Sequence, residues 1–490
     1  MSNQTLTSKP VFMKPTKIFP AFLLLIFLLN CSFSNNEGYK IEVKIEGLSE
    51  AECYLAYHFG NRQYLQDTTM ADAGGLLVFE GPERLDPGMY LVVLPGQQYF
   101  EIIVDQNQHF SLETKMGEFV PAMEFENSPD NQAFYEYLRF VSAKGQEVGP
   151  LREELHQEDT SPERIDEIRE KLAEADQQVR EKQNEYMEAF PDGLFTKVLL
   201  AQQEPEVPEA GIPETPEPGI PVDENEALRR QYQQYKNKFW NNIDFSDDRL
   251  LRTPVFHSML NRYFNNVVIQ VPDTVIKEAD RIVDKARAND EVFKYVIWFL
   301  TNNAERSEIM GMDAVFVHMV EEYYMSGEAF WVEPDNLERI AQRAMRLKPL
   351  LIGNTAPDIE MYTRDGETLS LHDVEAEYLV IYFWDSDCPH CKRVTPALRD
   401  LYHRKKDQGV KVFAVNTEAD RENWIKSKEE YNLDWINVND IHNRSGFRDK
   451  YDIYSIPLLF LLDSEKTIMA KRITVDQIEE IITREIEQNR

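Results

Sequence analysis

The chain is short of cysteine and of positive charge, and both shortages exclude classes of function. Four cysteines in 490 residues are too few for the disulfide framework of a small secreted scaffold. The 53 lysine and arginine residues stand against 86 aspartate and glutamate residues, which gives a formal net charge of −33. Because such a surface repels a phosphate backbone, we expect no nucleic-acid partner. A chain of this length is expected to form about two to four domains.

Long apolar runs are also rare, and the exception lies at the N-terminus. Residues 19–29 are almost entirely apolar, and the segment before them contains Lys9, Lys14 and Lys17 but no acidic residue. This pattern predicts a secretory signal peptide at residues 1–30. The apolar run is too short for a comfortable membrane span, and no later stretch is long and apolar enough to cross a bilayer. We therefore expect the body of the protein to be extracytoplasmic and soluble.

The end of this run contains a candidate lipidation site. Residues 28–31 resemble the bacterial lipobox, in which the cysteine is lipidated and becomes the mature N-terminus, although Asn30 replaces the usual small residue. We predict lipidation of Cys31, with residues 31–37 as a tether that holds the protein on the outer or inner membrane, facing the periplasm. Ordinary cleavage near Ser34 and an uncleaved anchor are the alternatives.

Residues 38–118 have the pattern of an all-β domain. Polar and apolar residues alternate over 39–45, and runs rich in β-forming residues follow at 89–94 and 99–104. Glycine and proline pairs separate these runs. We predict a β-sandwich that contains no cluster of catalytic residue types and acts as a docking or spacing module. Cys53 lies in a predicted strand and is interpreted as a small buried hydrophobe.

The middle of the chain is predicted to be all-α in two parts, residues 125–202 and 225–350. Ser161 followed by a proline is a helix start, and an apolar stripe of helical period continues until residues 190–193. The stripe fits the buried face of a bundle helix better than a coiled-coil seam. Residues 203–224 are rich in proline and glutamate, which predicts an exposed, extended insertion between the two helical parts.

A motif with two cysteines specifies the chemistry of the chain best. Cys388 and Cys391 are separated by Pro389 and His390, and this dithiol motif lies between an apolar run at 378–384 and a helical stretch. The first turn of a helix offers unpaired N–H groups and the positive end of the helix dipole, which stabilise a thiolate at Cys388. The side chain of His390 adds positive charge and so tunes the acidity of that thiol. We predict that Cys388 is the nucleophile and Cys391 the resolving cysteine.

Other uses of this spacing fit the sequence less well. A zinc site needs a second ligand pair, and the remaining cysteines, Cys31 and Cys53, lie far upstream, so we expect no metal. Haem attachment needs a histidine directly after the second cysteine, where Lys392 stands. We expect no other cofactor. A static disulfide remains an alternative, although so short a loop gains little closure entropy.

Residues 351–490 alternate between strand and helix patterns around this motif. The predicted elements are strands at 379–384 and 410–415, helices at 392–406 and 421–431, a hairpin at 458–470 and a last helix at 475–487. This order is that of a thioredoxin fold. The predicted fold class is therefore multidomain, with an N-terminal all-β sandwich, an all-α middle region and a C-terminal α/β thioredoxin fold.

The C-terminal segment resembles the TlpA/ResA-like branch of extracytoplasmic thiol-disulfide oxidoreductases. The matching positions are residues 353–358, Phe383 and Trp384, the dithiol motif, Pro396 and residues 455–457. The resemblance implies an exposed Cys388, a more buried Cys391, a cis peptide bond at Pro457, and substrate binding by Trp384 and the backbone of Ile456. The upstream regions resemble, more loosely, modules that precede such domains in Bacteroidota lipoproteins and whose function is unknown.

Departures from the family pattern bear on the chemistry. Tyr382 occupies the position of the buried aspartate of thioredoxins, and Val394 that of an acidic residue in the first helix of some family members. The proton acceptor that activates Cys391 is therefore unassigned. Asp385 and Asp387 oppose thiolate formation electrostatically, so we expect a moderately acidic nucleophile and not that of a strong oxidant.

We predict that the chain is a membrane-tethered, extracytoplasmic thiol-disulfide oxidoreductase that reduces protein disulfides. Its expected partners are a disulfide-containing protein substrate, the membrane, through the lipid anchor, and an upstream electron donor, a membrane thiol-disulfide relay. One alternative is a binding or scaffold lipoprotein whose disulfide is regulatory or structural. The other is a peroxiredoxin-type antioxidant, but Asp385 stands where a threonine or serine normally precedes the peroxidatic cysteine by three residues.

Overall fold

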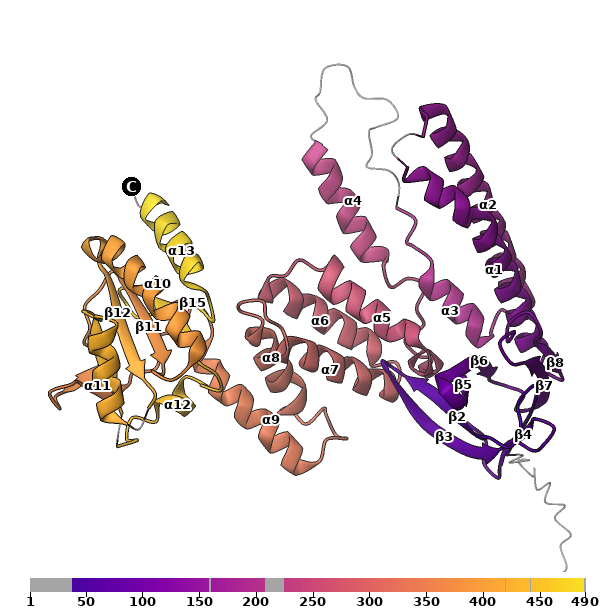
Figure 1. Ribbon diagram of the computed structural model, residues 1–490, viewed down its shortest axis with the longest axis horizontal. Helices are drawn as coiled ribbons and strands as arrows, with labels where there is room; N and C mark the ends of the chain where they lie inside the picture. Colours follow the sequence, from indigo (N-terminus) through magenta and orange to yellow (C-terminus); the bar gives the residue numbers. More distant parts are fainter. Residues whose placement is uncertain (1–37, 158–159, 208–223, 419, 441, 489–490) are drawn as a thin grey trace, which may run out of the picture.

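The computed structural model describes residues 38–157, 160–207, 224–418, 420–440 and 442–488. The predicted signal peptide, the tether with Cys31 and most of the proline-rich insertion lie outside the described residues. Two β-sheets lie near the N-terminal end of the molecule, helices fill the middle, and a third sheet flanked by helices forms the C-terminal end (Figure 1). This arrangement agrees with the multidomain layout predicted from the sequence.

The N-terminal region contains two four-stranded sheets, with strand orders β4-β1-β7-β8 and β3-β2-β5-β6. The strands are β1 Tyr39–Glu46, β2 Glu52–Phe59, β3 Arg62–Met70, β4 Leu76–Gly81, β5 Gly88–Leu94, β6 Gln98–Val104, β7 His109–Lys115 and β8 Glu124–Glu126. Alternation places Ile41, Val43 and Ile45 of β1 in the core, with the intervening side chains turned outward. Cys53 is buried in β2 and is a free thiol.

The middle region is helical. Its helices are α1 Pro129–Leu155, α2 Pro162–Ala189, α3 Leu194–Gln202, α4 Glu224–Lys238, α5 Pro254–Arg262, α6 Pro272–Ala286, α7 Asp290–Glu305, α8 Asp313–Met319 and α9 Pro334–Leu347. Helix α2 begins where the sequence predicts, because the Ser161 side chain accepts a hydrogen bond from the Arg164 backbone N–H. Helices α1 and α2 lie side by side as a hairpin (Figure 1), so α2 packs against another helix of the same chain.

One continuous hydrophobic core joins the N-terminal sheets to these helices. It extends from Tyr39 in β1 to Leu347 in α9. At the junction, the rings of Phe59 and Tyr295 meet edge to face at 5.8 Å, and the Gly60 backbone N–H donates to the Leu251 carbonyl at 2.7 Å. The sheets therefore pack against the helices as well as against each other.

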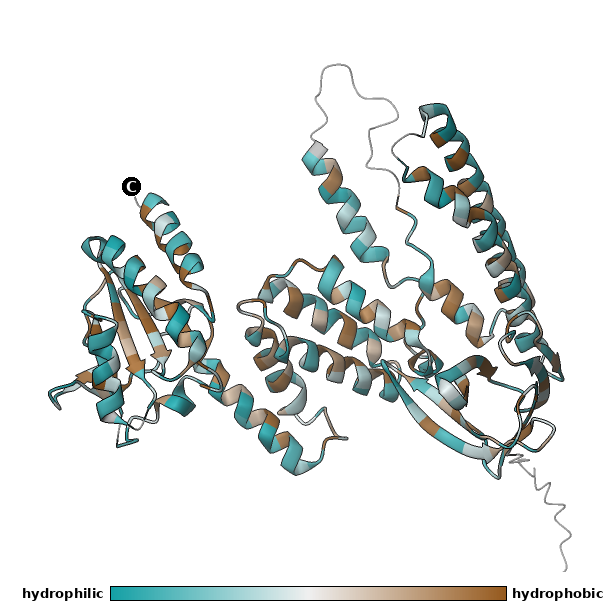
Figure 2. Cartoon of the chain, in the orientation of Figure 1, coloured by the Kyte–Doolittle hydropathy of each residue, from teal (hydrophilic) through white to brown (hydrophobic). Residues whose placement is uncertain are grey.

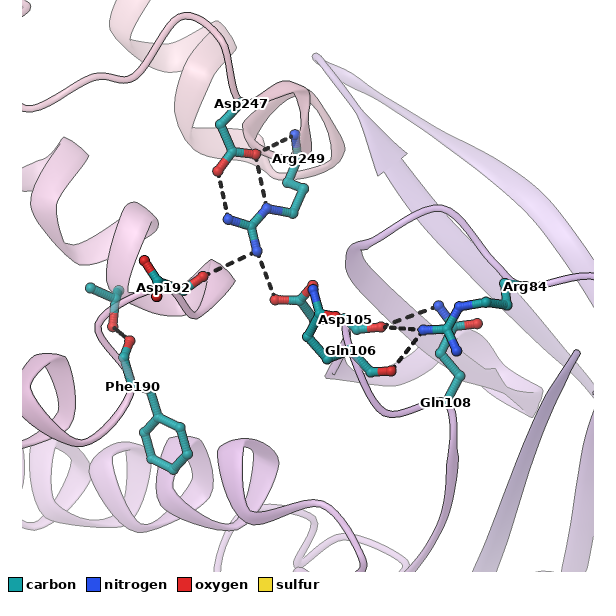
Figure 3. A network of polar contacts seen from close by, with 9 residues as sticks. Arg84, Asp105, Gln106, Gln108, Phe190, Asp192, Asp247 and Arg249 are labelled. Atoms are coloured by element: carbon teal, nitrogen blue, oxygen red, sulfur yellow. Dashed lines mark hydrogen bonds and ion pairs between the residues drawn. The ribbon is translucent and has the colours of Figure 1, made fainter. Parts of the chain in front are cut away.

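A polar network at this junction is centred on Arg249 (Figure 3). Its guanidinium binds the Asp105 carboxylate at 2.9 Å, the Asp247 carboxylate at 2.6 Å and the Asp192 carbonyl at 3.2 Å. These partners come from the loop after β6, the segment before Arg249 and the turn after α2. The network thus holds three segments, distant in the sequence, in one place.

The C-terminal domain is built on a seven-stranded sheet of order β10-β9-β13-β12-β11-β14-β15. Its strands are β9 Glu360–Tyr362, β10 Thr368–Ser370, β11 Tyr378–Trp384, β12 Val410–Asn416, β13 Ile436–Asn439, β14 Leu458–Leu462 and β15 Ile468–Lys471. Its helices are α10 Pro389–Lys405, α11 Arg421–Glu430, α12 Phe447–Lys450 and α13 Val475–Gln488. The elements predicted from the sequence are present in the predicted order, and the structure adds β9, β10, β13 and α12.

Two hydrophobic cores cover the two faces of this sheet. Residues 380, 382 and 384 of β11 face the core that contains Leu398 of α10 and Ile478 of α13, while residues 379, 381 and 383 face the core that contains Phe447 of α12. The central strands are accordingly apolar throughout, with more hydrophilic helices outside them (Figure 2).

Buried ion pairs connect this domain to the helical region. Lys471 of β15 binds the Asp313 carboxylate of α8 and donates to the Leu350 carbonyl. Arg343 of α9 binds the buried Asp452 carboxylate at 2.6 Å. Helix α9 lies between the two regions in Figure 1, and its Arg343 side chain contacts Asp452 in the segment that precedes β14.

Candidate functional site

The dithiol motif lies where β11 ends and α10 begins. Cys388 is the N-cap residue of α10, and its sulfur accepts a hydrogen bond from the Cys391 backbone N–H at 3.4 Å. Cys388 is half-buried, whereas Cys391 is only 1% exposed, and both are free thiols. The reactive sulfur therefore has unpaired helix N–H groups and the positive end of the helix dipole beside it, as the sequence pattern predicts.

The loop formed by residues 455–457, named here the cis-proline loop, lies against the first cysteine. The Ile456–Pro457 peptide bond is cis, and the Cys388 thiol donates to the Ile456 carbonyl at 3.6 Å. The exposed Tyr454 ring, just before the loop, is covered on one face by the Arg343 guanidinium of α9 at 4.6 Å from its centroid. The fold thus brings together Cys388, Ile456 and Pro457.

The two residues between the cysteines are exposed. Pro389 occupies the first turn of α10, where its missing N–H costs no hydrogen bond. The Nδ1 atom of His390 accepts a hydrogen bond from the Arg393 guanidinium at 2.8 Å. This contact places the positive charge of the Arg393 guanidinium beside the motif.

The structure does not support the predicted contact between Trp384 and a substrate. Trp384 is 1% exposed and its ring stacks on that of Tyr382, with centroids 6.1 Å apart. The side-chain alternation of β11 places both residues on the sheet face that α10 covers. Trp384 therefore supports the dithiol motif from the core and does not line its surface.

Tyr382, which replaces the aspartate expected in this strand, forms a hydrogen bond between two uncharged hydroxyl groups. Its hydroxyl lies 2.9 Å from the Thr395 hydroxyl of α10, and Thr395 in turn donates to the Cys391 carbonyl at 2.8 Å. Burial raises the pKa of Tyr382 above its ordinary value. The phenol stays protonated at neutral pH and offers no carboxylate to receive a proton from Cys391.

Cys391 requires such an acceptor. The pKa of its thiol rises to about 12, mainly because the thiol is buried and also because it is hydrogen-bonded to Cys388. Opposing these effects, the Asp385 backbone N–H is hydrogen-bonded to the sulfur. At neutral pH the resolving cysteine is therefore a thiol that must lose its proton before it attacks.

A carboxylic acid that sequence reasoning missed lies beside the motif. Glu418 follows β12, and its Oε1 accepts a hydrogen bond from the Ser386 backbone N–H at 2.5 Å. Burial, followed by a side-chain hydrogen bond with Asp385, raises the pKa of Glu418 to about 7. The predicted strand order could have indicated that Glu418 lies near the motif, because parallel neighbouring strands bring the residues after their carboxyl ends to the same edge of a sheet.

The described residues contain no group of three or more histidine, cysteine or acidic side chains arranged to hold a metal ion. Within the same residues, no helix has the length and apolar character that a membrane span requires.

Comparison with protein families identifies two parts of the chain. Residues 352–471 match the AhpC/TSA family, and residues 176–348 match a domain of unknown function, DUF5106. Among curated proteins, the thiol-disulfide oxidoreductase ResA of Geobacillus kaustophilus is 29% identical over 131 residues, which cover 26% of this chain and 74% of that protein. The ResA protein of Bacillus subtilis is 28% identical over 120 residues, which cover 24% of this chain and 64% of that protein.

Solved structures of proteins from Cytophaga and Bacteroides species resemble parts of the chain. A domain of a possible thiol-disulfide isomerase from Cytophaga hutchinsonii is 37% identical and covers 29% of this chain and 96% of its own, with a TM-score of 0.28. A thioredoxin-like protein from Bacteroides caccae is 21% identical and covers 56% of this chain and 99% of its own, with a TM-score of 0.45.

These findings define the class of the C-terminal domain. It is a thioredoxin-like domain of the AhpC/TSA family, and its curated relatives are ResA-like thiol-disulfide oxidoreductases. The chain is accordingly a thioredoxin-like thiol-disulfide oxidoreductase homologue that carries a DUF5106 domain upstream. The match spans roughly two thirds to three quarters of the length of the two curated relatives.

Proposed function

We propose that this chain reduces disulfide bonds in proteins outside the cytoplasm, while a lipid on Cys31 tethers it to the outer or inner membrane. The observation that carries the proposal is the position of Cys388 at the N-cap of α10, with its sulfur 3.6 Å from the Ile456 carbonyl. That geometry leaves a nucleophilic sulfur beside the backbone of the cis-proline loop, on which an extended substrate can lie.

The reaction proceeds in two exchanges. The Cys388 thiolate attacks one sulfur of the substrate disulfide, forms a mixed disulfide and releases the first substrate thiolate. Cys391 then loses its proton and attacks the Cys388 sulfur, which releases the second substrate thiolate. The substrate gains two electrons and two protons, and the two cysteines become a disulfide that an external dithiol donor must reduce again.

The partners follow from this cycle and from the N-terminal pattern. The substrate is a disulfide-containing protein, and the donor is a thiol-disulfide relay in the membrane. The exposed site, the acidic chain and the predicted signal peptide at residues 1–30 support a periplasm-facing location.

Replacement of the nucleophile tests the proposal. Cys388→Ser is expected to lower the reduction of insulin disulfides by at least about a hundredfold, because no thiolate remains to attack. Cys53→Ser serves as the control, since that thiol is buried in β2 far from the motif, and its activity should equal that of the native chain. A Cys388→Ser protein that reduces insulin at the native rate would refute the proposal.

Two measurements separate the alternative functions. A reduction potential below about −300 mV would indicate an inert structural bridge in a binding or scaffold protein. Stoichiometric consumption of peroxide that depends on Cys388 would indicate a peroxiredoxin. Asp385, which stands three residues before the nucleophile, is a half-buried carboxylic acid in this structure and argues against the latter.

A further inference from the structure

The resolving step lacks a proton acceptor at the two positions where related proteins carry one. Tyr382 is a buried, neutral phenol, and Val394 has no titratable group. Yet the buried Cys391 thiol must be deprotonated to attack the mixed disulfide. A base near this sulfur has to come from another part of the fold.

The strand register brings two acids to the required edge of the sheet. Trp384, the last residue of β11, pairs with Asn416, the last residue of β12. The backbone continues this contact, because Thr417 N–H donates to the Trp384 carbonyl at 2.8 Å. Asp385 and Glu418 follow directly, and their carboxyl groups hydrogen-bond to each other. These two side chains are named here the acid pair.

The acid pair adjoins the resolving cysteine. The Asp385 backbone N–H is hydrogen-bonded to the Cys391 sulfur, and the Asp385 carboxylate raises the pKa of that thiol electrostatically. Glu418 lies beside Asp385, because its carboxylate accepts from the Ser386 backbone N–H and contacts the Asp385 carboxyl group. Asp385 therefore contacts both Glu418 and the Cys391 thiol.

The surrounding side chains hold Glu418 firmly. Its backbone N–H donates to the Asn416 side chain at 3.1 Å, and its carbonyl accepts from the Asn439 side chain at 2.9 Å. The Asn423 amide lies 3.4 Å from Oε2. The Ser386 side chain is buried beside Glu418, where its hydroxyl favours the charged form of that carboxyl group and so lowers its pKa.

We infer that the acid pair is the proton acceptor for Cys391, with Glu418 taking up the proton when the mixed disulfide is resolved. This inference rests on the proposed function. In the step, the Cys391 S–H bond breaks and the proton goes to the acid pair, while the sulfur electron pair forms the bond to Cys388. The Cys388–substrate bond breaks, and the substrate leaves as a thiolate that is protonated by water.

The charges around Glu418 permit this role. The acidic group in contact with Glu418 is Asp385. Asp387, from the loop after β11, lies 3.4 Å from the same Asn423 amide, and Asp420 caps α11 two residues further along the chain. The nearby positive charge is that of Arg448 of α12, whose guanidinium donates to the Thr417 carbonyl at 2.6 Å. Strand β13 contributes only the neutral Asn439. Negative neighbours and burial make Glu418 a stronger base than an ordinary carboxylate, which suits proton uptake near neutral pH.

A two-phase thiol reaction tests the inference on the intact, reduced chain. One equivalent of 5,5′-dithiobis(2-nitrobenzoate) first reacts with Cys388 and releases one thionitrobenzoate. Attack by Cys391 on the mixed disulfide then releases the second, so absorbance separates the two steps. Cys391→Ser, which cannot complete the second step, defines the first phase.

For the native chain we expect the second-phase rate to rise with pH through about 7 and then level off, as Glu418 becomes a carboxylate. In Glu418→Gln the second phase should be at least about tenfold slower near neutral pH and should keep rising with pH, while the first phase stays within about threefold. Asp385→Asn should also slow the second phase. Glu422→Gln, an exposed Glu→Gln change on α11, is the matched control and should leave both phases unchanged.

The outcomes separate this inference from the proposed function. A Glu418→Gln chain with a native second phase and an unchanged pH profile would overturn the inference and leave the function intact. A native chain without a first phase would refute the proposed function and the inference with it. Circular dichroism checks the folding of each variant, and Asp385→Asn carries the test if Glu418→Gln does not fold.

Discussion

At the scale of single residues, the reactivity of the site depends on how deeply each titratable group is buried. Cys391 is held as a thiol by burial, whereas Cys388 is half-exposed at a helix N-terminus. Glu418 combines partial burial with an acidic neighbour, which favours its protonated form up to about neutral pH. These different environments support the proposed division of attack, resolution and proton uptake among the three residues.

The raised pKa of Glu418 predicts how stability changes with pH. The folded-state value is about 7 against an ordinary value of 4.5, so the folded chain binds this proton more tightly than the unfolded chain. The contribution is fully present below about pH 4.5 and is lost as pH rises through about 7. Urea unfolding at about pH 5 and pH 8 should therefore show that the native chain loses stability relative to Glu418→Gln as pH rises. An equal difference at both pH values would contradict the prediction, and Glu422→Gln should show no such trend.

At the scale of elements, strand β11 and helix α10 act as one unit. The strand delivers Cys388 to the helix N-terminus, and the bond between the Tyr382 and Thr395 hydroxyls ties the strand to the first turns of the helix. The adjacent end of β12 supplies Glu418. The site is thus built at the carboxyl ends of two neighbouring parallel strands.

Tyr382→Phe separates the structural role of this contact from proton transfer. Loss of one buried hydrogen bond should cost about 1 kcal/mol in the free energy of unfolding, since Thr395 retains its bond to the Cys391 carbonyl. The pH profile of the second thiol phase should keep its native shape, because the phenol is not the acceptor. Tyr402→Phe, on the outer part of α10, should change stability by less than about 0.5 kcal/mol. Loss of the pH profile in Tyr382→Phe would contradict this assignment.

At the scale of the whole molecule, the thioredoxin-like domain is fastened to the helical region. The buried Lys471 lies in β15 and its partner Asp313 lies in α8, so the ion pair joins the two matched domains. A second pair, Arg343 with Asp452, holds the segment that leads to the cis-proline loop. The upstream region therefore contacts the segment that leads to the cis-proline loop.

Asp313→Asn tests this connection. Lys471 is 5% exposed, and the change leaves its buried charge without the Asp313 carboxylate. The free energy of unfolding, measured by chemical denaturation, should therefore fall by about 3 kcal/mol. Adding Lys471→Met should recover much of the loss, because the buried charge is removed. Glu479→Gln breaks the exposed pair with Arg404 and should cost less than about 1 kcal/mol. A loss below about 1 kcal/mol for Asp313→Asn would show that this pair does not hold the domains together.

Some structural features could be predicted from local sequence patterns, whereas others depend on contacts between distant segments. Periodicity predicted β11, β12, β14, β15, α10, α11 and α13 of the C-terminal domain and the start of α2, because those patterns are local, whereas the short β9, β10, β13 and α12 were not predicted. The substrate contact predicted for Trp384 was wrong, because the alternation of β11 turns this side chain into the core, where it is 1% exposed. The N-terminal strands were predicted, but the continuous core that they share with the helices depends on contacts between distant segments.

The sequence by itself determined the dithiol motif, its position between a strand and a helix, and the order of elements that makes a thioredoxin-like domain. These depend on residue type, spacing and hydrophobic period, all of which are readable along the chain. Only the tertiary structure decided which acid accompanies Cys391, because the pairing of β11 with β12 brings Asp385 and Glu418 together from separate parts of the chain. It also decided the contact between the two matched domains, since Lys471 and Asp313 meet only when both regions are folded.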